Sequence, residues 1–186
     1  LFARNFAGKT REEAAEMIDG VRCAGGIPLF IGVDEEGGTV NRVSLNPELR
    51  GVPFWSPQDL YEEGGFELIR SDTQEKCELL SSLGINVNFA PVCDVSQDPD
   101  DFIYDRSFGR SAGETAEYAG LVVRTMSEEG MGSALKHFPG YGGNSDTHTG
   151  LAYDSRPYET FVNSDFLPFR AGIEAGAGMV MVSHNI

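Results

Sequence analysis

The sequence predicts an α/β fold of the barrel type, and three observations support this. Apolar runs alternate with helical patterns along the chain, which is the order of a parallel sheet with crossover helices. The apolar runs alternate little between polar and apolar residues, as expected of strands buried on both faces. Unusual polar residues follow the ends of these runs, and (β/α)8 barrels gather their functional groups at the carboxyl ends of the strands.

The expected strands are the apolar runs at residues 27–33, 85–95, 132–138 and 177–186. The opening Leu1-Phe2 is interpreted as the end of an earlier strand. About five of the eight β/α units of a barrel are therefore expected. No repeat, low-complexity stretch or linker divides the chain, so residues 1–186 are predicted to be a single, partial domain.

Helical patterns fill the intervals between the strands, at residues 10–25, 66–83, 111–129 and 164–175, with a shorter helix starting near Ser56. Two of these patterns open with the capping-box spacing, Thr10 with Glu13 and Ser111 with Glu114. A doubly wound sheet has the same order of elements. No Gly-x-Gly-x-x-Gly opens any of the helices, however, so a dinucleotide site has little support.

Composition excludes several classes of partner. The 29 acidic and 14 basic residues give a net charge of −15, which argues against binding to nucleic acid or to anionic membrane surfaces. No apolar run approaches the ~20 residues of a membrane span. The three cysteines are scattered and are expected to be buried thiols. The chain begins with Leu1 and not with Met, so the natural N-terminus is expected to be absent and the localisation stays undecided.

Candidate binding residues lie where strands end. Asp34 and Arg42 belong to "VDEEGGTVNR", where a carboxylate could accept hydrogen bonds from sugar hydroxyls; a solvated acidic turn is the alternative. Arg106 could donate a fork of hydrogen bonds to a hydroxylated ligand, or form a surface ion pair with a neighbouring aspartate. Lys136 and His137 are adjacent, so both reach one ligand only if the strand ends and twists there.

The segment "SDTHTG" carries the sharpest local signal. Asp146 precedes His148 by two residues, so its carboxylate can accept the Nδ1–H of the imidazole and fix its tautomer. Such a pair can act as a general acid and then as a general base near neutral pH. A loop turn with an incidental histidine is the alternative interpretation.

Several motifs together resemble glycoside hydrolase family 3, in its β-N-acetylglucosaminidase branch. They are "IGVDEEGGTVNRV", "NFAPVCDV", "DRSFG", "KHFPGYG…DTH" and "FLPFRAGIEAGAGMVMVSHN", in the family's order and spacing over nearly the whole chain. The resemblance implies a (β/α)8 barrel that hydrolyses β-linked N-acetylglucosamine with retention of configuration. It implies that His148 is the acid/base and that Asp146 is its partner. The sugar-binding residues that it implies are Asp34, Arg42, Arg106, Lys136 and His137.

The sequence departs from the family's pattern in three ways, and one is a spacing from Gly142 to Asp146 that is shorter than in some members. Tyr141 stands where many members have histidine. The nucleophilic aspartate of the family belongs to a later strand, beyond Ile186, so the chain alone is expected to be inactive. Either the chain is part of a longer protein, or its open sheet edges near Phe2 and Met181 are expected to pair with another chain.

The resemblance implies no metal or organic cofactor, and it implies a β-N-acetylglucosaminide as the substrate. The sequence does not choose among a peptidoglycan fragment, a chitin oligomer and an aryl glycoside. Two other functions stay open. One is a metal-dependent barrel hydrolase that uses His137, His148 and His184 with Asp146; the other is a non-catalytic sugar-binding fragment.

Overall fold

The computed structural model describes residues 1–23, 26–144 and 152–185. One parallel sheet runs through it in the order β1-β2-β3-β4. Its strands are β1 (Gly32–Val33), β2 (Val87–Asn88), β3 (Gly132–Phe138) and β4 (Met179–Val182). The spatial order equals the chain order, as in a barrel, whereas a doubly wound sheet reverses its strand order at a switch point. The arrangement therefore agrees with the predicted barrel.

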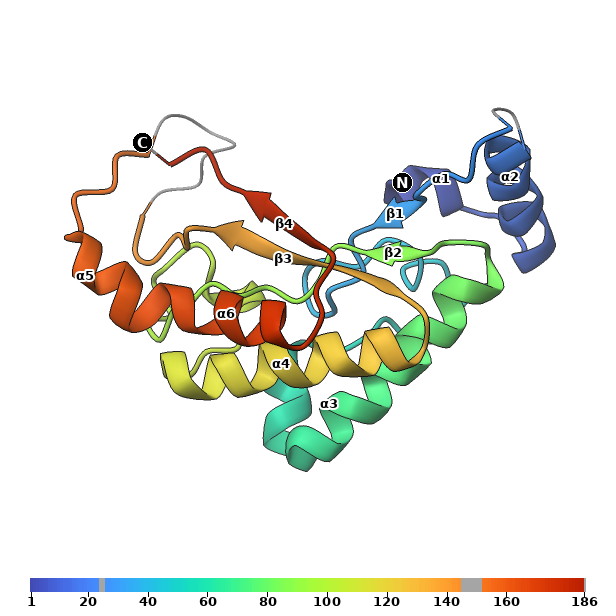
Figure 1. Ribbon diagram of the computed structural model, residues 1–186. Coiled ribbons are helices and arrows are strands. Elements are labelled where there is room, and N and C mark those ends of the chain that lie inside the picture. The colour runs from blue at the N-terminus through green and yellow to red at the C-terminus, as the bar shows by residue number, and fades with distance from the viewer. Residues whose placement is uncertain (24–25, 145–151, 186) are drawn as a thin grey trace.

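Helices cover one side of this sheet, as they cover the outside of a barrel. Figure 1 shows α3, α4 and α6 beneath the strands, and α4 contacts both α3 and α6. The helices are α1 (Ala3–Phe6), α2 (Arg11–Cys23), α3 (Pro57–Ser82), η1 (Tyr104–Arg106), α4 (Ala112–Glu128), α5 (Tyr158–Thr160), the π-helical turn η2 (Phe161–Asp165) and α6 (Phe166–Glu174). In the part of the chain that the structure describes, no helix has the length and hydropathy of a membrane span.

The predicted helix starts at Thr10 and Ser111 are confirmed, whereas the helix expected from Ser164 is preceded by α5 and η2, so helical structure there begins at Tyr158. Both capping boxes form: Thr10 and Glu13 exchange hydrogen bonds ahead of α2, and Ser111 and Glu114 do so at the start of α4. The two helices expected after residue 56 are joined into α3, which is kinked where Gly65 adopts a φ of 62°.

Three strands are shorter than predicted: β4 covers only Met179–Val182 of the expected 177–186, and at β1 and β2 other groups replace the ladder. Before β1, the side chain of Asn86 accepts from the Ile31 N–H at 2.7 Å and donates to the Leu29 carbonyl at 3.0 Å. After β2, Pro91 has no N–H to donate, yet the chain still follows β3, since the Cys93 N–H reaches the Lys136 carbonyl at 2.6 Å.

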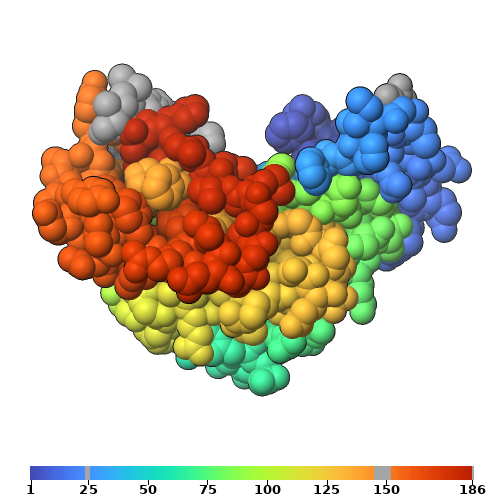
Figure 2. Space-filling model, viewed as in Figure 1, coloured from blue at the N-terminus to red at the C-terminus, as the bar shows by residue number. Residues whose placement is uncertain are grey.

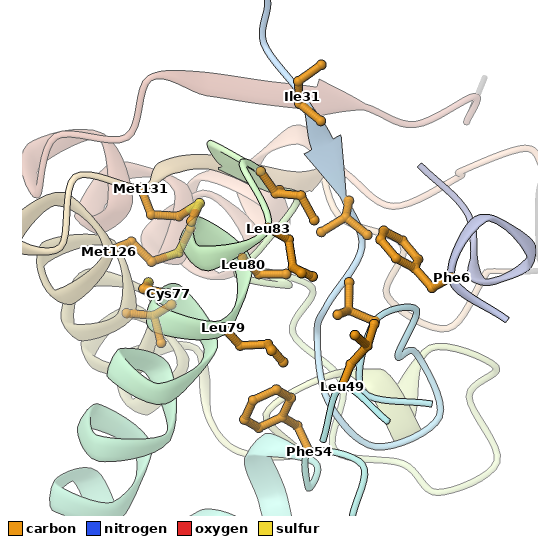
Figure 3. Packing of buried hydrophobic residues seen from close by; sticks show 14 of the residues in the cluster. Phe6, Ile31, Leu49, Phe54, Cys77, Leu79, Leu80, Leu83, Met126 and Met131 are labelled. Carbon is orange, nitrogen blue, oxygen red and sulfur yellow. The ribbon is translucent and has the colours of Figure 1, made fainter. Parts of the chain in front are cut away.

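The main core lies between α3, the first strand and the N-terminal helices. Figure 3 shows Leu79 and Leu80 of α3, with Leu83 just after the helix, directed toward Phe54 and neighbouring apolar side chains. Cys77 lies in this core, as predicted. The prediction that Cys23 is buried is wrong: it is exposed. It lies five residues after the buried Ile18, which at 3.6 residues per turn turns it about 140° away from the buried face of α2.

Apolar side chains are exposed along the edge strand β4. Val180 is 42% and Val182 is 64% exposed, and Phe30, which precedes β1, is 83% exposed. Figure 2 shows a hollow between the C-terminal segments in red and the N-terminal segments in blue. The expected pairing of these edges with another chain stays a prediction.

Candidate active site

A cleft of about 520 Å³ opens at the carboxyl ends of β1, β3 and β4. All the residues for which sugar binding was predicted line it: Asp34, Arg42, Arg106, Lys136 and His137. They come from three separate segments of the chain, the turn after β1, η1 and the end of β3, and meet because the carboxyl ends of parallel strands share one edge of the sheet. The structure thus brings this set together, while the binding role of each member stays a prediction.

Glu36 lies at the centre of the charged groups. Its carboxylate is 2.5 Å from Lys136 Nζ, and it accepts two hydrogen bonds from Arg106, from Nε at 3.0 Å and from Nη2 at 2.8 Å. Lys136 also donates to Asp34 Oδ1 at 2.7 Å. The Lys136 side chain is 1% exposed and that of Glu36 is 4% exposed, so this ion pair is held away from bulk water.

The environment keeps these groups charged. Burial alone would raise the pKa of Glu36, but the positive charges of Lys136 and Arg106, with the hydrogen bonds they donate, bring it below its ordinary value. Burial would likewise lower the pKa of Arg106, and the hydrogen bonds and charge of Glu36 raise it instead. Glu36 is therefore an ionised anchor for two cations and not a proton donor.

His137 forms a buried pair with Asp94. Asp94 Oδ2 lies 2.7 Å from His137 Nδ1 and also accepts the His137 backbone N–H at 3.1 Å. Because the carboxylate only accepts, the assigned proton is on Nδ1, which leaves Nε2 to accept from Arg106 Nη2 at 3.2 Å. Asp94 Oδ1 accepts the backbone N–H of Tyr141 at 2.9 Å, so the same carboxylate orients the chain after β3.

Lys136 and His137 both face the cleft although they are adjacent on β3. The register between β3 and β4 shifts between Lys136 and Phe138, which interrupts the alternation of side chains. The peptide bond that joins Lys136 to His137 is cis. The sequence predicted that both side chains reach one ligand only if the strand ends and twists here, and the register shift near the end of β3 agrees with this.

The acidic turn after β1 is not a solvated surface turn, because Glu35 and Glu36 are buried. Glu35 is fully buried, and its carboxylate accepts the backbone N–H groups of Arg42 at 2.8 Å, Val43 at 2.7 Å and Ser44 at 3.1 Å. Gly37 has a φ of 101°, and a Cβ there would lie 2.1 Å from the Trp55 carbonyl oxygen. The turn therefore needs glycine, and it brings the Arg42 side chain to the cleft.

Arg106 does not form the alternative ion pair with the aspartates near it in sequence. The short helix η1 places it at the cleft, where its salt bridge is with Glu36 at 2.8 Å. The pair joins the loop after β1 to the loop after β2, across 70 residues of sequence. The surface interpretation of Arg106 is therefore wrong.

Asp146 and His148 lie outside the residues that the structure describes, so the predicted dyad stays a prediction. On the two sides of this segment, Arg156 donates hydrogen bonds to the Gly140 carbonyl at 2.9 Å and to Asp165 Oδ1 at 2.8 Å. In residues 1–23, 26–144 and 152–185, no three His, Cys, Asp or Glu side chains are grouped as metal ligands would be.

Two functional candidates were absent from the sequence-based set. Glu36 stands in a run of three carboxylates, Asp34 to Glu36. Their residue types do not indicate which of them forms ion pairs with Lys136 and Arg106. Asp94 does follow an apolar run, which is the signal that marked the other candidates, but its partner lies 43 residues away.

Fold and site together define a TIM-type barrel domain with a cleft of paired charges at the carboxyl ends of its strands. The model of the glycosyl hydrolase family 3 N-terminal domain matches residues 1–186, so the chain belongs to this family.

Named relatives agree with this assignment. The chain is 38% identical to a "Beta-hexosaminidase" of Xylella fastidiosa (strain M12) over 191 residues and 37% identical to one of Xanthomonas campestris pv. campestris (strain B100) over 190 residues. In each case all of this chain aligns, and it spans 56% of the relative's length.

Solved structures of the same family have this fold. A glycoside hydrolase family 3 β-N-acetylglucosaminidase from Paenibacillus sp. str. FPU-7 superposes with a TM-score of 0.90 at 29% identity, over 100% of this chain and 35% of that one. Native NagZ from Neisseria gonorrhoeae superposes with a TM-score of 0.85 at 28% identity, over 100% of this chain and 55% of that one. The chain is therefore part of a (β/α)8 barrel.

Proposed function

We propose that the complete protein is a retaining β-N-acetylhexosaminidase that removes β-linked N-acetylglucosamine. The observation that carries the proposal is the charged cluster in the cleft, in which Glu36 holds Lys136 and Arg106 at fixed positions. Asp34 accepts from Lys136 and keeps 29% of its side chain exposed. Fixed donors beside an exposed carboxylate match the alternating donors and acceptors of sugar hydroxyls.

In the proposed reaction the sugar binds against Asp34, Arg42, Arg106, Lys136 and His137. His148 donates its proton to the glycosidic oxygen as the C1–O bond breaks, while an aspartate from outside these 186 residues attacks C1. The leaving alcohol departs, and a covalent glycosyl-enzyme forms. His148, now neutral, takes a proton from water, and the hydroxyl attacks C1 and releases the aspartate. Two displacements at C1 give overall retention.

Asp146 is proposed to accept the Nδ1–H of His148, which keeps Nε2 directed at the substrate and stabilises the imidazolium. His137 has Asp94 as a carboxylate partner, and we assign it to binding. Its Nε2 lies 3.2 Å from Arg106 and its Nδ1 lies 2.7 Å from Asp94. Both ring nitrogens are therefore engaged, and neither is positioned to carry a proton to a leaving group.

The proposal is tested with aryl N-acetylglucosaminides whose leaving groups differ in basicity. In the complete protein, His148→Ala should slow substrates with poor leaving groups far more than those with good ones, because a good leaving group needs little protonation. His137→Ala is the matched control, and it should weaken both substrates to a similar degree. Equal losses in His148→Ala would refute its role as the acid. A wild-type protein that binds but does not hydrolyse these glycosides would leave only the sugar-binding function.

A further inference from the structure

A buried ion pair lies behind the cleft, on the inner face of α3. Lys76 Nζ is 2.5 Å from Asp72 Oδ2, and the two side chains are 10% and 8% exposed. Lys76 also donates to the backbone carbonyl of Glu36 at 3.1 Å, and its Nζ lies 5.1 Å from the centre of the Phe54 ring. The pair thus connects a helix on the outside of the sheet to the residue at the centre of the cleft.

Stability alone does not account for this pair. Removing two charges from water is costly, and well-packed apolar residues of similar size often serve a fold equally well or better. Apolar side chains already surround the position, since Ile69 and Leu80 on α3 are 2% and 0% exposed. What an apolar pair could not supply is the hydrogen bond to the Glu36 carbonyl.

That hydrogen bond completes the fixation of the Glu36 backbone. The N–H of Glu36 donates to the Val40 carbonyl at 2.9 Å, and its carbonyl accepts from Lys76. The next residue, Gly37, passes so near that a Cβ on it would lie 3.3 Å from Lys76 Nζ. Both backbone polar groups of Glu36 are therefore held, and its carboxylate projects from a fixed point.

Glu36 also separates two spaces. On one side it lines the cleft, and on the other it lines a small pocket of about 20 Å³, together with Asp72 and Lys76. Without the hydrogen bond from Lys76, the main chain at Glu36 would keep only the hydrogen bond from its N–H to the Val40 carbonyl. Lys136 and Arg106 would then lose the position of the anchor that they share.

We propose that Lys76, paired with Asp72, is a positioning residue for sugar binding. By fixing the Glu36 carbonyl, it sets where the Glu36 carboxylate holds Lys136 and Arg106 in the cleft. This inference rests on the proposed function. Lys76 does not touch the substrate in this scheme, so its loss should raise KM and leave kcat nearly unchanged.

The test uses two double variants of the complete protein, because Lys76→Met alone would leave Asp72 buried without a partner. Asp72→Leu/Lys76→Met replaces the pair by apolar residues. Asp72→Asn/Lys76→Gln keeps a neutral hydrogen-bonded pair whose shorter side chain cannot reach the Glu36 carbonyl. For both, KM for an aryl N-acetylglucosaminide and the inhibition constant of N-acetylglucosamine should rise about tenfold, with kcat changed by less than about threefold, as expected when one hydrogen bond that orders a site is lost.

The matched control removes the exposed ion pair that joins the same helix to α4, in Arg70→Met/Glu128→Gln, whose two side chains are 44% and 55% exposed. It should leave KM and kcat unchanged. Thermal midpoints separate folding from binding: a double variant that keeps the midpoint and still shows the rise in KM supports the inference. Unchanged KM and inhibition constant in either folded double variant would overturn it.

Failure of the proposed function has a different signature, since the wild-type protein would then not hydrolyse the glycoside. Crystal structures of the wild type and of Asp72→Leu/Lys76→Met decide the positioning role in that case. A longer distance from Lys136 Nζ to the Glu36 carboxylate than the present 2.5 Å supports the inference, and an unmoved Glu36 overturns it.

Discussion

Replacing Glu36 by glutamine probes the centre of the site with almost no change in shape. In the wild type, the Glu36 carboxylate lies 2.5 Å from Lys136 Nζ. It also accepts hydrogen bonds from Arg106 Nη2 at 2.8 Å and Nε at 3.0 Å. Glutamine keeps one acceptor oxygen, but its NH2 group must face at least one of these donors. We therefore expect Glu36→Gln to lower the free energy of unfolding and to weaken sugar binding together.

The size of the effect follows from what remains after the change. Removing one partner of a buried ion pair costs about 3–5 kcal/mol. Asp34 stays 2.7 Å from Lys136 and still compensates its charge, which places the loss at the lower end, about 3 kcal/mol. Urea denaturation of the complete protein, followed by circular dichroism, measures this difference. A loss below about 1 kcal/mol, the range of exposed ion pairs, would refute the reasoning.

The pH dependence gives an independent check. The pKa of Glu36 lies below its ordinary value of 4.5, so ionised Glu36 stabilises the fold fully above the unfolded pKa. That contribution is lost as the pH falls through the lower, folded pKa. The stability difference between wild type and Glu36→Gln should thus be largest above pH 4.5 and shrink on acidification. Glu128→Gln, at an exposed pair, should show a difference that is small at every pH.

Four further changes test the surrounding structure and the predicted dyad. Asp94→Asn should cost about 1–3 kcal/mol in the free energy of unfolding, measured in urea, because an amide cannot accept at both His137 and Tyr141. Gly140→Ala should cost at least about 1–3 kcal/mol, since its φ is 115° and a Cβ would lie 2.7 Å from Asp165 Oδ1. Gly113→Ala in α4, where nothing lies within 4 Å, should be neutral or slightly stabilising in the same assay. Asp146→Asn should move the alkaline limb of the pH–rate profile downward, and an unchanged profile would contradict its role beside His148.

Much of the fold could be predicted because local sequence signals favour the same helices and strands that the tertiary structure contains. The capping boxes at Thr10 and Ser111 mark helix starts by hydrogen bonds within four residues of sequence. Strand lengths could not be predicted in the same way. Whether 27–33 continues as a strand depends on Asn86, whose side chain takes the place of the ladder from 55 residues away.

The site shows the same division between local and distant information. The position of Asp34, Lys136 and His137 at strand ends is a local signal, and it predicts their convergence without naming their partners. Glu36 could not be selected from its neighbours, because its role depends on Lys136 and Arg106, 100 and 70 residues further along the chain. Geometry, and not residue type, distinguishes it from the buried Glu35, whose carboxylate only holds the backbone of its own turn.

The balance of charge in the cleft explains how a strongly acidic chain builds a site rich in cations. Lys136 and Arg106 are each paired with Glu36, Asp34 also pairs with Lys136, and Asp94 holds His137. Lys136 and Arg106 are thus each held by a carboxylate at a defined distance, and their remaining N–H groups point in fixed directions. Such a cluster offers oriented hydrogen bonds without a large net field, which suits a neutral, hydroxylated ligand better than a phosphorylated one. The cost of burying these charges is therefore offset by preorganisation: the groups that would meet the sugar are already in place before it binds.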